Sequence, residues 1–132
     1  PYPRRSDAFG INVAGVVAGQ SDDANAPMRL GHLVRWVDGV VEDLGAIGSY
    51  TRPARPAAPV AINDAGAIAG TWQAGTTVSP LPFPQHAFLW QLGQYTDLGS
   101  LGGPSSTSSA TAINGLGWVV GSSRTPESYT HA

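Results

Sequence analysis

The chain has 132 residues, of which 12% are charged and 42% hydrophobic, with 17 glycines, 11 prolines and no cysteine. With a net charge of −2 and arginines scattered among acidic residues, the sequence has no clustered basic footprint for nucleic acid, and the lack of cysteine excludes disulfides, CxxC metal sites and a thiol nucleophile. The apolar content is too high for a disordered linker, so we expect a turn-rich folded chain with no membrane span.

The first predicted element is a short motif that recurs three times. Its copies are residues 9–19, 60–70 and 111–121, and in each an Ile-Asn pair is followed by glycines three and seven residues after the asparagine. The copies are 51 residues apart. Asparagine can hydrogen-bond local backbone and glycine accepts a positive φ, so each copy predicts a strand, a turn and a returning strand. The predicted pairs are 8–12 with 15–20, 59–63 with 66–71, and 110–114 with 117–122.

A second motif follows the first two copies of the first motif. It covers residues 32–48 and 86–102, and each copy contains His, then Trp four residues later, and ends with Asp-Leu-Gly-x-x-Gly. Asp38-Gly39 is a strong hairpin signal, which predicts a two-residue turn. That turn places Val34 opposite Asp43 and Trp36 opposite Val41, with His, Trp and Asp on one face of the hairpin.

Each unit therefore supplies four short strands in about 50 residues, which is typical of a β-propeller blade. We predict an all-β fold of antiparallel four-stranded repeats, a partial propeller of about two and a half blades. The units are residues 1–58, 59–109 and 110–132. Because repeats cover their apolar faces by stacking on neighbours, we expect two uncovered terminal faces, an unpaired strand edge near Gly121 and self-association in solution.

Several spaced phrases resemble the HAF repeat family of bacterial extracellular repeat proteins. They are His-Ala-Phe-Leu-Trp at 86–90, Asp-Leu-Gly-Ser-Leu-Gly-Gly at 97–103, and Ala-Ile-Asn with Gly-Trp-Val-Val-Gly within 112–121. The first unit departs from the pattern, since His-Leu-Val at 32–34 replaces His-Ala-Phe. The resemblance implies tandem repetition and secretion or surface display, and it assigns no catalytic residue.

The recurring polar residues allow two interpretations. The histidines suggest metal binding or catalysis, and the aspartates suggest an acid–base pair for glycoside chemistry. However, one histidine per unit has no ligand partner at metal spacing, and an aspartate before Leu-Gly at a strand end suits bonds to backbone N–H groups. We therefore predict structural roles, with each histidine bonded within its own unit and the paired tryptophans packed between sheets. These residues are His32, Trp36, Asp43, His86, Trp90, Asp97, Asn12, Asn63 and Asn114.

Two other tryptophans, Trp72 and Trp118, do not recur at equivalent positions, so we predict exposed ligand contacts there. The linkers 20–31 and 71–85 vary in length and predict a ligand surface. The expected function is a non-catalytic extracellular or cell-surface binding module, without cofactor, metal or catalytic residues, for a glycan, a protein, further repeats or itself. The alternative is a fragment of a propeller enzyme acting on polysaccharide, with catalytic residues outside this chain.

Overall fold

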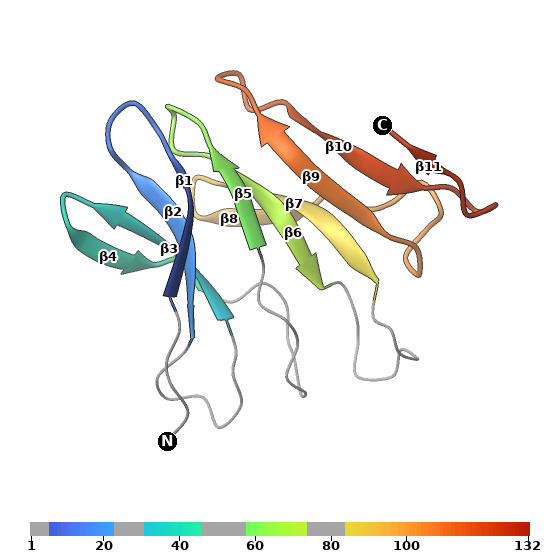
Figure 1. Ribbon diagram of the computed structural model, residues 1–132, viewed down its shortest axis with the longest axis horizontal. Coiled ribbons are helices and arrows are strands. Elements are labelled where there is room, and N and C mark those ends of the chain that lie inside the picture. The colour runs from blue at the N-terminus through green and yellow to red at the C-terminus, as the bar shows by residue number, and fades with distance from the viewer. Residues whose placement is uncertain (1–5, 23–30, 46–57, 74–83) are drawn as a thin grey trace.

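The computed structural model describes residues 6–22, 31–45, 58–73 and 84–132, and within these ranges the chain forms three antiparallel sheets and no helix (Figure 1). The all-β prediction is confirmed. Most of the predicted ligand loops, namely residues 23–30 and 74–83, lies outside the described ranges.

The first sheet contains β1 (Ser6–Ile11), β2 (Val17–Asp22), β3 (Gly31–Val37) and β4 (Val40–Asp43). The second contains β5 (Ala58–Ile62), β6 (Ile68–Gln73), β7 (Gln85–Gln91) and β8 (Gln94–Asp97). The third contains β9 (Ser108–Ile113), β10 (Val119–Arg124) and β11 (Thr130–His131).

The first hairpin of each sheet is built by the asparagine motif, as predicted. In the second sheet, the Gly66 amide donates to the carbonyl of Asn63 at 3.0 Å, and the Ala67 amide donates to the Asn63 side chain at 2.9 Å. Gly66 has a φ of 80°, which glycine adopts at no steric cost. The side chain of Asn63 therefore closes its own turn. The three turns lie along one end of the structure, at the top of Figure 1.

The second hairpin of each complete sheet has the predicted register. Val34 pairs with Asp43 and Trp36 with Val41 in the first sheet, and the second sheet repeats these pairs with Phe88–Asp97 and Trp90–Tyr95. The two turn residues have positive φ in both copies: 51° and 79° at residues 38 and 39, and 51° and 78° at residues 92 and 93. Positive φ at both central positions gives a type I′ turn, which matches the twist of the strands.

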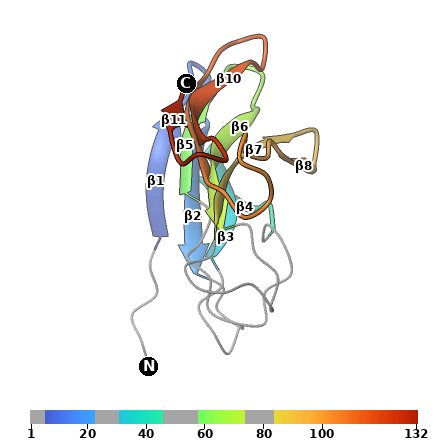
Figure 2. The ribbon, with the colours of Figure 1, turned by 90° about the vertical axis from the view of Figure 1, so that its right-hand side faces the viewer.

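The sheets stack face to face, with β1, β5 and β9 adjacent and the β7–β8 hairpin on the opposite side from β1 and β5 (Figures 1 and 2). Apolar residues fill the space between neighbouring sheets. The cluster between the first and second sheets contains Ala18, Leu33, Ile62, Ile68, Phe88 and Trp90, and a smaller cluster toward the third sheet contains Ala69, Ala87 and Ala110. Each sheet is thus stabilised mainly by its neighbours.

The two terminal faces carry exposed apolar side chains, as predicted for stacked units. On the first sheet, Ile11 is 67% exposed and Val41 55%; on the third, Trp118 is 72% exposed and Val120 62%. Among the described strands, the predicted open edge near Gly121 is also present, although it is shorter than expected because β11 pairs with the last two residues of β10. No described helix is long and apolar enough to cross a membrane.

Candidate functional site

The asparagine turns are joined to one another across the sheets. The side-chain amide of Asn12 donates to the carbonyl of Asn63 at 3.1 Å, and that of Asn63 donates to the carbonyl of Asn114 at 2.9 Å. The amide of Val13 also donates to the carboxylate of Asp64 at 3.2 Å. A row of hydrogen bonds with the 51-residue period of the repeat therefore connects all three sheets, which supports the structural role predicted for these asparagines.

The histidine of the second motif bonds the predicted aspartate in both copies. In the second sheet, Nδ1 of His86 lies 3.0 and 2.9 Å from the two carboxylate oxygens of Asp97. In the first, Nδ1 of His32 lies 3.0 and 2.7 Å from those of Asp43. A carboxylate can only accept, so Nδ1 donates in both pairs. The side chain of His86 is 6% exposed and that of His32 is 20% exposed.

Each aspartate also fixes the strand end beside it. Asp43 accepts the amide of Gly45 at 2.7 Å, and Asp97 accepts the amide of Gly99 at 2.7 Å. Burial, the largest influence, raises the pKa of Asp43, but the hydrogen bonds from His32 and Gly45 and the charge of His32 outweigh it, so the pKa is lowered overall. The carboxylates therefore accept hydrogen bonds from backbone amides and from the histidines, as predicted.

The two recurring tryptophans have different surroundings. Trp90 is 6% exposed in the cluster between the first two sheets, and the guanidinium of Arg35 lies 5.5 Å from the centre of its ring. Trp36 lies against Gly19, where a Cβ atom would come within 2.5 Å of the indole ring. Trp90 therefore packs between two sheets, as predicted. Trp36 lies opposite Val41 on the terminal face of the first sheet and packs against its own sheet, so the prediction of packing between sheets is corrected for Trp36.

The two tryptophans predicted as ligand contacts have different surroundings. Trp118 is 72% exposed, as predicted. Trp72 packs against the core cluster instead, and its indole nitrogen is buried. The reason is the register: Trp72 lies opposite His86, so both side chains share the face of the second sheet that turns toward the first. The prediction that Trp72 is exposed is therefore corrected.

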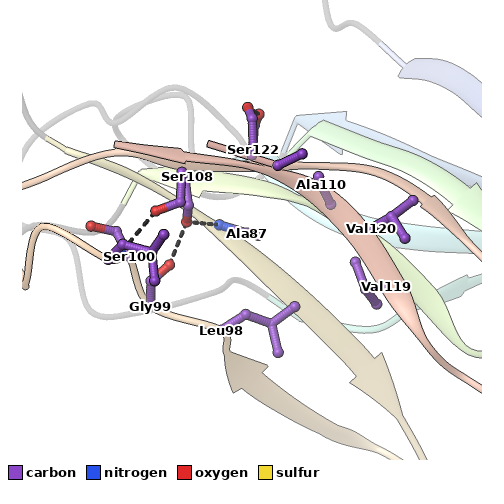
Figure 3. A pocket seen from close by; sticks show the side chains of 14 residues that line it. Ala87, Leu98, Gly99, Ser100, Ser108, Ala110, Val119, Val120 and Ser122 are labelled. Carbon is purple, nitrogen blue, oxygen red and sulfur yellow. Dashed lines mark hydrogen bonds between the residues drawn. The ribbon is translucent and has the colours of Figure 1, made fainter. Parts of the chain in front are cut away.

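An open groove of about 390 Å³ lies between the second and third sheets (Figure 3). Ala87 and Leu98 line it from the second sheet, and Ala110, Val119 and Gly121 line it from the third. Leu98 is 44% exposed although it carries a large apolar side chain. The groove therefore leaves part of a large apolar side chain exposed.

One end of the groove is polar. The hydroxyl of Ser108 donates to the carbonyl of Gly99 and accepts the amide of Ala87 at 2.9 Å, both drawn in Figure 3. The amide of Leu101 donates to the hydroxyl of Ser123 at 2.8 Å. These bonds connect the loop after β8 to the third sheet and hold the groove in shape.

Sequence reasoning missed the groove and the contacts of Tyr95. The Tyr95 hydroxyl donates across the first interface to the carbonyls of Leu44 and Gly45, at 3.3 and 3.2 Å, and burial raises the pKa of this phenol, with a smaller effect from Asp43. The sequence did contain a signal for the groove, because the residues that line it occupy the same repeat positions as core residues between the first and second sheets.

The described residues contain no group of three or more His, Cys, Asp or Glu side chains able to hold a metal ion. The features left for recognition are the groove and the exposed face around Trp118. Searches of protein-family models, curated proteins and solved structures gave no match to this chain.

Proposed function

We propose that this chain is a non-catalytic binding module of an extracellular or cell-surface repeat protein and that its units are β-propeller blades. Four-stranded antiparallel sheets, stacked face to face with their first strands adjacent, support the blade assignment. The resemblance of the repeated phrases to HAF repeats supports export.

The observation that carries the binding role is the exposed apolar face of the third sheet. Trp118 and Val120 occupy the repeat positions of Ala67 and Ala69, which are 5% and 0% exposed in the second sheet. In the first sheet, Ala18 takes the position of Val120 and is also fully buried against the next sheet. The position of Val120 is thus buried in two units and that of Trp118 in one, and both carry larger apolar side chains than those alanines where they are exposed. Such a surface suits the apolar face of a sugar ring or of a protein partner.

A glycan array tests the binding role, and an assay of reducing ends released from polysaccharides tests the enzymatic alternative. We expect bound glycan without released product, and at least a tenfold weaker signal for Trp118→Ala, because an exposed indole contributes much of the contact area. Leu116→Ala, in the same turn and 79% exposed, is the matched control and should leave binding unchanged.

Two results would contradict the proposal. Release of reducing ends by the purified chain would assign catalysis to it. Equal glycan binding by the Trp118→Ala variant would place the binding surface elsewhere. If no glycan binds, sedimentation velocity at rising concentration tests binding to a protein partner. We then expect the chain to self-associate and the Trp118→Ala variant to lose this self-association. A monomer at all concentrations would reject this form of the proposal.

A further inference from the structure

The three asparagine turns have the same hydrogen bonds but differ in the residue that follows the asparagine. That residue is Val13 in the first turn, Asp64 in the second and Gly115 in the third. Glycine has no Cβ atom, so its backbone nitrogen is open to approach from the preceding side chain. The third turn therefore contains an Asn-Gly pair, in which an asparagine side chain reaches the next backbone nitrogen with the least steric hindrance.

The nitrogen of Gly115 is unobstructed in the structure as well. A Cβ atom built on Gly115 would meet no atom within 4 Å. Among the described residues, no hydrogen bond holds the amide of Gly115, and the same is true of the amide of Asp64, whereas the amide of Val13 donates to the Asp64 carboxylate. The reactive nitrogen of the third turn is thus both accessible and free of a competing acceptor.

The side-chain carbonyl of Asn114 is polarised by two backbone amides. Leu116 and Trp118 donate to its Oδ1 at 3.0 and 2.9 Å. Donors directed at an oxygen stabilise the negative charge that the oxygen gains when a nucleophile attacks its carbon. The turn therefore holds Cγ of Asn114 close to the main chain as an electrophile, and the nitrogen of Gly115 is the next backbone atom after the Asn114 carbonyl.

The asparagines of the other two turns are held more firmly. Within the described ranges, each accepts a single amide through Oδ1. Each also donates its side-chain nitrogen to the next turn, Asn12 to the carbonyl of Asn63 at 3.1 Å and Asn63 to that of Asn114 at 2.9 Å. Asn63 is only 6% exposed, whereas Asn114 is exposed. Loss of the side-chain nitrogen of Asn12 or Asn63 would break a bond between sheets, so the fold protects both.

We propose that Asn114 is a site of spontaneous deamidation, in which its side-chain amide becomes a carboxylate through a cyclic imide with Gly115. Hydroxide removes the amide proton of Gly115, and the nitrogen attacks Cγ of Asn114. The N–Cγ bond forms, the Cγ–Nδ2 bond breaks, and Nδ2 takes a proton from water and leaves as ammonia.

Water then opens the imide at either of its carbonyls. Opening at Cγ breaks the new N–Cγ bond and gives aspartate at position 114. Opening at the main-chain carbonyl breaks the original peptide bond and gives isoaspartate, whose backbone is longer by a methylene and whose main-chain carbonyl has become a carboxylate. Both products add a negative charge to the turn that carries the exposed Trp118.

The test incubates the folded 132-residue chain in heavy-oxygen water at mildly alkaline pH and locates the incorporated oxygen by proteolysis and mass spectrometry. We expect the label at Asn114, as a mixture of aspartate and isoaspartate. Its rate of incorporation should exceed those at Asn12 and Asn63 at least about tenfold, which corresponds to a barrier lower by about 1.4 kcal/mol. Isoaspartate is identified separately by enzymatic methylation of its free carboxylate.

Two variants of the same turn separate the reactive pair from the surrounding surface. Gly115→Val gives the third turn the residue found at position 13 of the first, so the turn can accommodate it, and deamidation should slow at least about tenfold. Leu116→Ala keeps the Asn-Gly pair and the backbone amide that donates to Oδ1, so it should leave the rate unchanged.

Denaturation in urea tests the protection of the other asparagines, since it breaks the bonds between the turns. Labelling of Asn12 and Asn63 should become faster in urea than in the folded chain. Equal rates at the three asparagines in the folded chain, an unchanged rate in Gly115→Val, or no label at Asn114 after an incubation that labels the denatured chain would overturn the proposal.

Discussion

The side-chain amide of Asn63 donates to the backbone carbonyl of Asn114 at 2.9 Å, although the two residues are 51 positions apart in the chain. The same side chain accepts the amide of Ala67 through its oxygen, at 2.9 Å. One buried residue therefore closes its own turn and ties its sheet to the next. Asn114 closes its turn in the same way, through bonds from Leu116 and Trp118, but it is exposed.

This difference predicts unequal effects of the same substitution. Asn63→Asp keeps the accepting oxygen but replaces the donor with a second acceptor, which faces the carbonyl of Asn114. We expect a loss of about 1–3 kcal/mol in the free energy of unfolding, the cost of an unpaired buried polar group. Asn114→Asp is the matched control and should change stability by less than about 0.5 kcal/mol. Urea denaturation measures both, and equal losses would contradict the role of the inter-sheet bond.

The histidine–aspartate pairs offer a second comparison. Asp97→Ala removes the partner of His86, whose side chain is 6% exposed, and should cost about 1–3 kcal/mol because a buried donor is left unpaired. Asp43→Ala removes the same bonds around His32, where the imidazole is 20% exposed and water can replace the carboxylate. We expect about 1 kcal/mol or less there. Thermal unfolding of the two variants in the same buffer compares the two losses of stability. A larger loss for Asp43→Ala would contradict the prediction.

The lowered pKa of Asp43 predicts an acid-dependent term in stability. A folded-state pKa below the unfolded value of about 3.9 means that the unfolded chain binds the proton more readily, so the contribution is present above pH 4 and is lost as the pH falls further. The stability advantage of wild type over Asp43→Asn should therefore shrink between pH 7 and pH 3. His32→Ala removes a bond that lowers the pKa, so the Asp43 titration followed by NMR should move upward. An unchanged titration would reject this cause.

The strands and their registers could be predicted because turn chemistry fixes them locally. Asp38-Gly39 sets a two-residue turn, and that turn alone decides that Val34 lies opposite Asp43. The His–Asp bonds followed from this register. The second unit has the same spacing between its motif residues, so the same strand pairing could be predicted there.

The exposure of individual side chains was harder to predict, because it depends on which sheet covers which face. Trp72 was expected at the surface because it does not recur, yet it packs toward the first sheet. The groove was missed for a related reason: Leu98 is a core residue by its repeat position and becomes a groove residue only because no described strand covers it. Periodicity identifies equivalent positions, and stacking decides which of them are buried.

The turn at Leu92 is the position where a substitution should stabilise the chain. Leu92 has a φ of 51° and is 97% exposed, so its side chain adds left-handed strain without packing. Asparagine adopts this conformation more readily, and Leu92→Asn should raise the free energy of unfolding by about 0.5–1 kcal/mol. Asp38 occupies the same turn position in the first sheet with the same φ of 51°, so Asp38→Leu should lower it by a similar amount. Chemical denaturation of both variants checks the pair, and a loss of stability in Leu92→Asn would show that Leu92 makes contacts which its exposure does not indicate.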